Sequence, residues 1–217
     1  MNEHIDLYCE RMSQDLLAEP LNLVSNFSFI FAAIVHIRQY LDPNMGNKRP
    51  HKYLYLYLII LVFTIGVGSS LFHSFATRWA MLADVIPIGV YLVSYLPIYM
   101  MVCGDFKPQH TVMLISYFAI VTLIGAQVPS TLANGSQNYF GALITLASLG
   151  VLSKIREHTG YFFLLKASGI LCFSLFFRAI DEFICPILPM GTHFLWHLCN
   201  GLVLYQSLHF VRIQIMN

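Results

Sequence analysis

Two histidines four residues apart, His193 and His197, are the clearest candidates for chemistry in this sequence. Residues at this spacing lie on one face of a helix, one turn apart, so both imidazoles can reach a single metal ion. The surrounding segment 191–197 (GTHFLWH) begins an apolar stretch, where ionisable side chains are costly and mark functional sites. The alternative is that each histidine is a hydrogen-bonded packing residue, and the spacing alone leaves both interpretations open.

A third histidine, His73, ends another apolar stretch, and Asp84 follows eleven residues later. On one continuous helix these two residues would lie about 16 Å apart. If the chain reverses between them, they return to the same depth. Ser69 lies one helical turn before His73, in the segment 66–69 (GVGS). The alternative for Ser69 is a small residue in a helix-packing patch.

Three neutral imidazoles that leave one coordination position open are typical of catalytic zinc. We therefore predict that His73, His193 and His197 bind Zn²⁺. Zinc lowers the pKa of a bound water towards about 7, and a neighbouring carboxylate, Asp84, can then act as the general base. Ser69 can donate a hydrogen bond to the developing oxyanion. Alternatively, Asp84 is a fourth ligand, which would close the site.

A second polar cluster lies near the N-terminus. Glu19, Asn22 and Asn26 follow an i, i+3, i+7 pattern on one helical face, and Asp6 and Glu10 precede them. Carboxylate and amide oxygens are the hard ligands that Ca²⁺ prefers, so Glu19, Asp6, Glu10 and Asn22 are candidate calcium ligands. The alternative is a capped helix start whose acidic residues complement the helix dipole.

Two further sets of residues have simpler interpretations. Arg178 and Asp181, three residues apart, are predicted to form an ion pair that closes an apolar helix. The five cysteines form no Cys-x-x-Cys pair and are scattered through apolar stretches, which favours buried free thiols. They are Cys9, Cys103, Cys172, Cys185 and Cys199.

The composition indicates a membrane protein. Of the 217 residues, 57% are hydrophobic and only 11% are charged, whereas a soluble domain is about 25% charged. A bilayer as solvent explains this deficit, while a buried core alone does not, because a small soluble fold still needs a wet surface. The net charge of +1 argues against a nucleic-acid partner. Residues 1–19 are acidic, unlike the basic start of a signal peptide.

Apolar stretches of about 20 residues, long enough to cross a bilayer as a helix, occur seven times. They lie near residues 20–41, 53–73, 80–102, 110–128, 137–153, 160–179 and 192–212. Residues 53–102 would make about 75 Å of helix, so the chain must reverse at the polar cluster 73–78. We predict an all-α integral membrane protein, with residues 1–217 forming a single seven-transmembrane helix bundle.

Basic residues orient the predicted bundle, because cytoplasmic loops are enriched in lysine and arginine. Eight gather at one end, namely Arg38, Lys48, Arg49, Lys52, Lys107, Lys154, Arg156 and Arg212, and three at the other, namely Arg11, Arg78 and Arg178. This asymmetry favours an external N-terminus and a cytoplasmic C-terminus. The predicted zinc ligands, with Ser69 and Asp84, then all lie near the external side and can converge at one depth.

Taken together, these motifs resemble those of the alkaline ceramidase family, within the wider group that includes adiponectin receptors. The matching pieces are Ala18-Glu19-Pro20-Leu21-Asn22 with Ser25-Asn26, Gly66-x-Gly68-Ser69-x-x-Phe72-His73, Asp84, and His193-x-x-x-His197. The resemblance implies a seven-helix fold, zinc on the three histidines, Asp84 beside the activated water, Ser69 as oxyanion donor, and hydrolysis of the amide bond of ceramide.

Two segments depart from the family pattern. Val85 follows Asp84, where members often have glutamate, and the segment 5–10 (IDLYCE) is shorter than the calcium loop of animal members. The short segment 8–11 (YCER) is similar to bacterial members, which implies a location in the bacterial inner membrane.

We therefore expect a zinc-dependent intramembrane amidase that acts on ceramide or a related N-acyl lipid of the surrounding membrane. One alternative is a lipid sensor or receptor that keeps zinc for structure and has no significant turnover. Another is a haem-binding membrane cytochrome, because paired membrane histidines also ligate iron. Replacing Asp84 by Asn separates the first two hypotheses, and a Soret band identifies the third.

Overall fold

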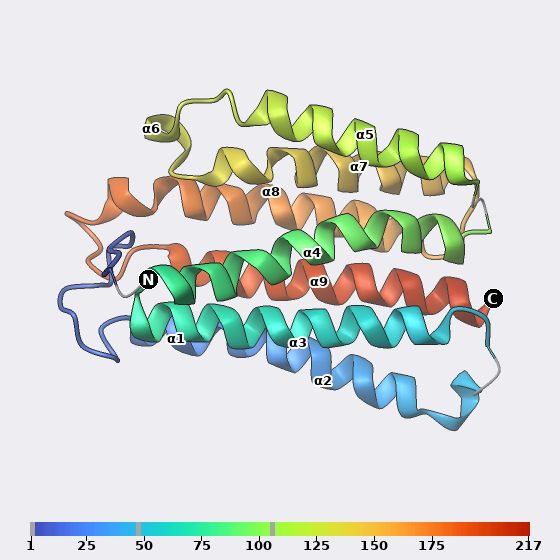
Figure 1. Ribbon diagram of the computed structural model, residues 1–217, viewed down its shortest axis with the longest axis horizontal. Helices are drawn as coiled ribbons and strands as arrows, with labels where there is room; N and C mark the ends of the chain where they lie inside the picture. Colours follow the sequence, from blue (N-terminus) through green and yellow to red (C-terminus); the bar gives the residue numbers. More distant parts are fainter. Residues whose placement is uncertain (1–2, 47–48, 105–106) are drawn as a thin grey trace.

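The computed structural model describes residues 3–46, 49–104 and 107–217. Within these ranges the protein is helical, and its extended pairing is limited to one isolated antiparallel bridge between His4 and Thr77. The long helices run side by side along the longest axis of the molecule (Figure 1). The prediction of an all-α fold is confirmed.

The helices occupy the predicted apolar stretches, with ends that differ by a few residues. The first stretch is broken at Asn26 into α1 (Pro20–Ser25) and α2 (Phe27–Leu41). The other long helices are α3 (Lys52–Phe75), α4 (Arg78–Val102), α5 (Pro108–Gly125), α7 (Phe140–Ile155), α8 (Tyr161–Ile184) and α9 (His193–Met216). Three short helices lie in connections, namely η1 (Pro43–Met45), α6 (Ser130–Ala133) and η2 (Ser136–Tyr139).

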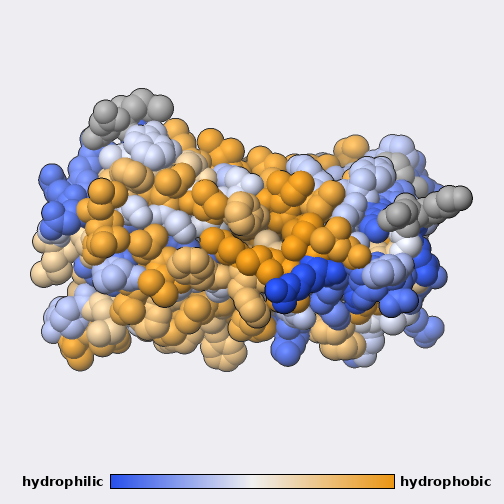
Figure 2. All heavy atoms as spheres, turned by 90° about the horizontal axis from the view of Figure 1, so that it is seen from below, coloured by the Kyte–Doolittle hydropathy of each residue, from blue (hydrophilic) through white to orange (hydrophobic). Residues whose placement is uncertain are grey.

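Six helical segments in the described part of the chain are long and apolar enough to cross a membrane, and α9 is not among them. They are Pro20–Leu41, Lys52–Phe75, Arg78–Val102, Pro108–Gly125, Ser136–Ile155 and Tyr161–Ile184. Apolar residues cover most of the middle of the face in Figure 2, and polar residues gather towards its two ends. α9 has 24 residues and is long enough to span a membrane, so it is its polar residues that keep it out of this set. The predicted count of seven spans is therefore not confirmed.

The reversal between α3 and α4 lies where the sequence predicts it, between Phe75 and Arg78. Ala76 adopts the left-handed conformation at φ 46°, and its carbonyl accepts a 2.7 Å hydrogen bond from the Ile5 amide. The N-terminal segment therefore folds over this turn. The two helices approach so closely at Gly68 that a Cβ there would lie 2.0 Å from the carbonyl oxygen of Ala83.

The two ends of the bundle have different chemistry. One end carries the N-terminal segment, the end of α3 and the starts of α4 and α9, and we call it the histidine end (Figure 1). The opposite end carries the C-terminus and most of the basic residues, and we call it the basic end. Of the eight basic residues predicted there, Lys48 lies outside the described residues.

A disulfide between Cys9 and Cys185 joins the N-terminal segment to the connection between α8 and α9 at the histidine end. The expectation of buried free thiols is therefore wrong for these two cysteines. Cys103, Cys172 and Cys199 are free thiols, but they are not buried: Cys103 and Cys199 are half-buried and Cys172 is exposed. The two partners are 176 residues apart in the sequence, so no local spacing could reveal the pairing.

Candidate metal centre and active site

The structure brings His73, His193 and His197 together at the histidine end. His73 lies in the last turn of α3, and the other two lie in the first turns of α9. Their candidate ligand atoms lie within 4.8 Å of one another, and all three residues are buried. Among the described residues, this is the group of histidine, cysteine and acidic side chains whose geometry can hold a metal ion.

The hydrogen bonds of these imidazoles leave nitrogen atoms available for a metal. Nδ1 of His73 lies 2.5 Å from Oε2 of Glu19, and Nδ1 of His197 lies 2.8 Å from the hydroxyl of Ser25. The buried Nε2 of His73 and Nδ1 of His193 have no hydrogen-bond partner. Because a buried polar atom without a partner is costly, the orphaned nitrogens fit a bound cation. Hydrogen bonds to the opposite nitrogen are what orient histidine ligands in metal sites.

Glu19 connects His73 to a buried arginine. Its Oε1 accepts a 2.5 Å hydrogen bond from Nε of Arg11, and its Oε2 accepts a second bond from the Asn22 amide at 3.0 Å. Burial alone would raise the pKa of the Glu19 carboxyl, but its bonds to His73, Asn22 and Arg11 lower the pKa below its ordinary value. Glu19 is therefore ionised, and it accepts a hydrogen bond from the Nδ1–H group of His73.

Arg11 lies inside a set of oxygen atoms. Besides Glu19, it donates to main-chain carbonyls, namely those of Ser13 at 3.2 Å, Asp15 at 3.4 Å and His73 at 2.9 Å. Only 5% of its surface is exposed. The guanidinium of Arg11 is therefore surrounded by carboxylate and carbonyl oxygens, the same types of ligand atom that Ca²⁺ binds.

Of the predicted calcium ligands, Glu10 and Glu19 have protein partners, whereas the buried Oδ1 of Asn22 has none. The Glu10 carboxylate accepts the backbone N–H groups of Leu21 and Asn22 at 2.6 and 2.8 Å, as the alternative of a capped helix start requires. Glu19 is bound to Arg11, and Asp6 is exposed. The calcium site therefore stays a prediction, and the positive charge of Arg11 beside Glu19 argues against it.

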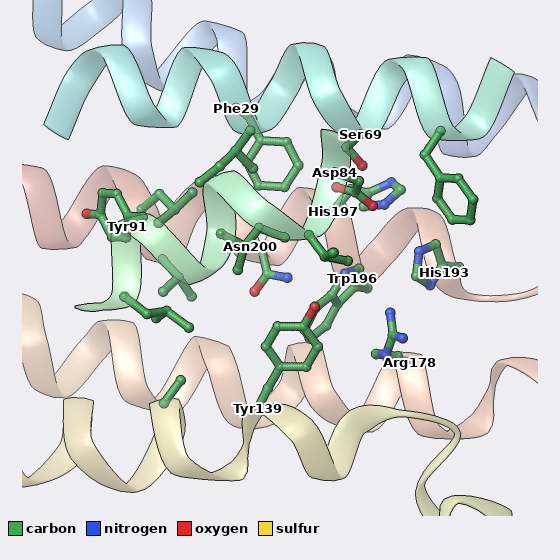
Figure 3. A pocket seen from close by; sticks show the side chains of 18 of the residues that line it. Phe29, Ser69, Asp84, Tyr91, Tyr139, Arg178, His193, Trp196, His197 and Asn200 are labelled. Atoms are coloured by element: carbon green, nitrogen blue, oxygen red, sulfur yellow. The ribbon is translucent and has the colours of Figure 1, made fainter. Parts of the chain in front are cut away.

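Ser69 and Asp84 approach the histidines from α3 and α4 (Figure 3). The Ser69 hydroxyl donates a hydrogen bond to Asp84, and Asp84 interacts electrostatically with His73. Both side chains line the same pocket as His193 and His197. The predicted convergence of these residues is therefore present, and the close approach at Gly68 is what places Ser69 next to α4.

An apolar pocket extends from the histidines into the bundle. Its walls include Phe29, Ile65, Ile88 and Val203. A second cavity continues it towards the basic end and shares six lining residues with it, namely Tyr91, Leu92, Ala142, Leu171, Val203 and Leu204. A polar site that opens onto a long apolar cavity suits a ligand with one polar group and a hydrocarbon chain.

The family assignment follows from a comparison of sequences. The ceramidase family model matches residues 5–216, nearly the whole chain. The chain belongs to the ceramidase family. Among curated proteins, none matches it. Membership indicates a hydrolase of the ceramide amide bond and a lipid substrate, in agreement with the apolar cavity and the apolar helices.

The predicted ion pair between Arg178 and Asp181, both described residues, is absent. Asp181 Oδ1 instead accepts the backbone N–H groups of Thr192 and His193 at 2.6 and 2.9 Å. The carboxylate thereby satisfies the N-terminus of α9, where unpaired N–H groups favour negative charge. Arg178 turns into the pocket and lies over the rings of Tyr139 and Trp196.

Tyr8 is a residue of the candidate site that the sequence analysis missed. Its ring stacks on that of His193, with a centroid distance of 3.8 Å and an interplanar angle of 25°. The neighbouring disulfide of Cys9 holds the N-terminal segment over the site. Burial raises the pKa of the Tyr8 hydroxyl above its ordinary value, so it stays protonated. In the sequence, the only indication of this position is the neighbouring Cys9, and Cys9 becomes informative only when its disulfide partner, Cys185, is known.

Proposed function

We propose that this protein is a zinc-dependent intramembrane amidase that hydrolyses the amide bond of ceramide or a related N-acyl lipid and releases a fatty acid. One observation carries the proposal. Three buried imidazoles, two of them with an orphaned nitrogen, lie beside Asp84 and Ser69 at one end of a long apolar pocket. Each part has a counterpart in the reaction, namely a metal, a base, an oxyanion donor and a site for the acyl chain.

Zinc is the metal that best suits the donor set. Three neutral imidazoles and an open position are its usual catalytic environment. Bound Zn²⁺ would supply Lewis-acid activation of water and of the amide carbonyl. His73, His193 and His197 would hold it, and Asp84, already bonded to Ser69, stays outside the ligand set.

The side chains of the pocket carry out proton transfer, stabilisation of the oxyanion and binding of the acyl chain. Asp84 accepts a proton from the attacking water and returns it to the leaving nitrogen. Ser69 orients this carboxylate and donates a hydrogen bond to the oxyanion of the attacked carbonyl. Glu19 keeps the proton of His73 on Nδ1, so that Nε2 remains a ligand. The apolar walls bind the acyl chain and exclude bulk water.

We also propose that α9 is a seventh membrane span and that the histidine end faces outwards. Its 24 residues match the length of α3 and α8, and its polar side chains include pocket-lining residues. The disulfide between Cys9 and Cys185 supports the orientation, because disulfides persist in oxidising compartments. The concentration of basic residues at the other end agrees with a cytoplasmic C-terminus.

Metal analysis combined with lipid hydrolysis tests the proposal. Purified protein should contain one zinc per chain and release fatty acid from N-acyl lipids, and a chelator should abolish release until zinc is restored. His197→Ala should lose most of the metal, whereas His110→Ala, at an exposed position of the basic end, should keep it. A zinc-containing protein that releases fatty acid from no N-acyl lipid would instead be a lipid sensor.

A further inference from the structure

Arg178 is a positive charge that faces the pocket, and Asp84 acts on it electrostatically without forming a close ion pair. It lines the same pocket as His193 and Asp84, and in the described part of the chain no carboxylate lies within 4 Å of its guanidinium. Its Nε is buried and has no hydrogen-bond partner. Because an unpaired charge in a membrane-embedded site is costly, such a residue marks a function and calls for a partner.

The protein holds this guanidinium with aromatic rings. Cζ of Arg178 lies 5.6 Å from the ring centre of Tyr139 and 5.2 Å from that of Trp196, and the Tyr8 hydroxyl accepts a hydrogen bond from it. A Cβ at position 135 would lie 2.8 Å from an Nη atom of Arg178, so Gly135 leaves the necessary space. Rings stabilise a cation without neutralising it, and the charge therefore remains available to a ligand.

The aromatic residues around Arg178 lie next to the histidine cluster. Trp196 stands 6.5 Å from His193 between ring centres, and Tyr8 contacts both Arg178 and His193. Figure 3 shows Arg178 and His193 at the same end of the pocket, with Tyr139 on the side of the apolar walls. A ligand whose amide reaches the histidines would place its neighbouring polar group close to Arg178.

The charges of the pocket leave room for an anion. Its acidic side chain, Asp84 of α4, is bonded to Ser69 and also interacts electrostatically with His73 and with Arg178 of α8, so one carboxylate is shared among several groups. A divalent metal on three neutral imidazoles adds two positive charges, which Asp84 alone does not balance. An anionic group on the ligand would reduce this excess and supply the missing partner of the guanidinium.

We propose that Arg178 binds a carboxylate of the lipid ligand. A guanidinium matches the two oxygens of a carboxylate with parallel hydrogen bonds. The carboxylate has two chemical sources, the head group of an N-acyl amino acid or the fatty acid released by hydrolysis. This inference rests on the proposed function, because it concerns the substrate class or the product of the same pocket.

A binding experiment without turnover tests the carboxylate site itself. Palmitate and hexadecanol have the same chain length and differ in charge, and their equilibrium binding to the detergent-solubilised, zinc-loaded protein can be compared. Arg178→Gln should weaken palmitate binding about 10–100-fold, the contribution of hydrogen bonds to charged groups, and leave hexadecanol binding within about two-fold. Arg78→Gln makes the same charge change at an exposed site of the same end and should alter neither.

Equal effects on both ligands, or no effect on palmitate, would overturn the proposal. If Arg178→Gln fails to fold, Arg178→Lys serves instead, because it keeps the charge but loses the planar fork, and a smaller selective loss is expected. Zinc content and the thermal unfolding midpoint, measured for each variant, separate a lost contact from a lost fold.

Hydrolysis distinguishes the two sources of the carboxylate. If the head group supplies it, Arg178→Gln should lower kcat/KM for N-palmitoyl-glycine about 10–100-fold and leave N-palmitoyl-sphingosine within a few-fold. If the product supplies it, the ratio of the two kcat/KM values should stay constant while the inhibition constant of palmitate rises. Should wild-type protein hydrolyse neither lipid, the proposed amidase function fails, and the binding comparison still decides the role of Arg178.

Discussion

Glu19 accepts a 2.5 Å hydrogen bond from Nδ1 of His73 through one oxygen and binds Arg11 through the other. The pair fixes the tautomer and the orientation of the His73 ring, and the orphaned Nε2 is thereby left for a metal. The histidine cluster and the N-terminal segment are consequently one structural unit, because Arg11 also binds the His73 carbonyl.

The first prediction concerns this pair. Glu19→Gln removes the negative charge that holds the His73 proton on Nδ1, and zinc affinity should fall about 10–100-fold, as it does when such supporting partners are lost. Competition with a chelator of known affinity measures the change. Glu10→Gln is the matched control, because Glu10 caps α1 and does not contact a histidine; equal affinities for the two variants would contradict the role given to Glu19.

A second prediction follows from Arg11. Since a guanidinium occupies the oxygen cage formed by Glu19 and three main-chain carbonyls, lipid hydrolysis should not depend on calcium. A calcium-selective chelator that leaves zinc in place should change the rate of hydrolysis by less than about two-fold. Arg11 supplies the positive charge at this position, so the chelator removes no contact of the site. Loss of activity that added calcium restores would show that a calcium site exists elsewhere.

The third prediction uses the close approach of α3 and α4. A methyl group at Gly68 would lie 2.0 Å from the Ala83 carbonyl oxygen, so Gly68→Ala must push the helices apart and move Ser69 away from Asp84. We expect a loss of about 1–3 kcal/mol in stability, as for other overpacked sites, together with reduced hydrolysis. A methyl group at Gly89 in α4 would have no neighbour within 4 Å, so Gly89→Ala should leave stability and hydrolysis unchanged. Equal losses in the two variants would contradict the claim that the close approach at Gly68 positions Ser69.

The fourth prediction concerns orientation. Thr131→Cys lies at an exposed position of the histidine end, and Gln109→Cys at an exposed position of the basic end. A membrane-impermeant thiol reagent applied to intact cells should label the first and spare the second, with the parent chain as the background. The reverse pattern would place the active site on the cytoplasmic side.

The fold follows from local sequence in most places, and so does the core of the site. Apolar stretches of bilayer length define the long helices, and the reversal before Arg78 follows because residues 53–102 are too long for one crossing. Once the helices and the reversal are known, His73, His193 and His197 lie at one depth and can converge, while the packing of α3 beside α9 had to come from the structure. α9 is less apolar partly because His193, His197 and Asn200 line the pocket, so residues that reveal the site also help to keep α9 out of the six candidate spans.

The supporting contacts could not be predicted, because their partners are distant in the sequence. Asp181 caps α9 and also accepts the Cys9 amide, 172 residues away, at 3.5 Å. The i, i+3 spacing from Arg178 suggested a local ion pair, but the N-terminus of a helix offers a carboxylate two N–H groups in fixed positions. The N-terminal segment has no periodicity, so its placement over the histidines required the structure.

The most direct test of the central claim compares fatty-acid release from one N-acyl lipid by the wild-type protein and by Asp84→Asn, each containing the same amount of zinc. Asp84 takes the proton of the attacking water without ligating the metal, so its loss should lower kcat by about 10²–10⁴-fold while zinc content stays constant. Ser69→Ala, assayed alongside, should also keep its zinc and lose about 10²–10³-fold in kcat. Loss of zinc from Asp84→Asn with full activity of Ser69→Ala would contradict this mechanism, because Asp84 would then be a fourth ligand of a closed, structural metal site.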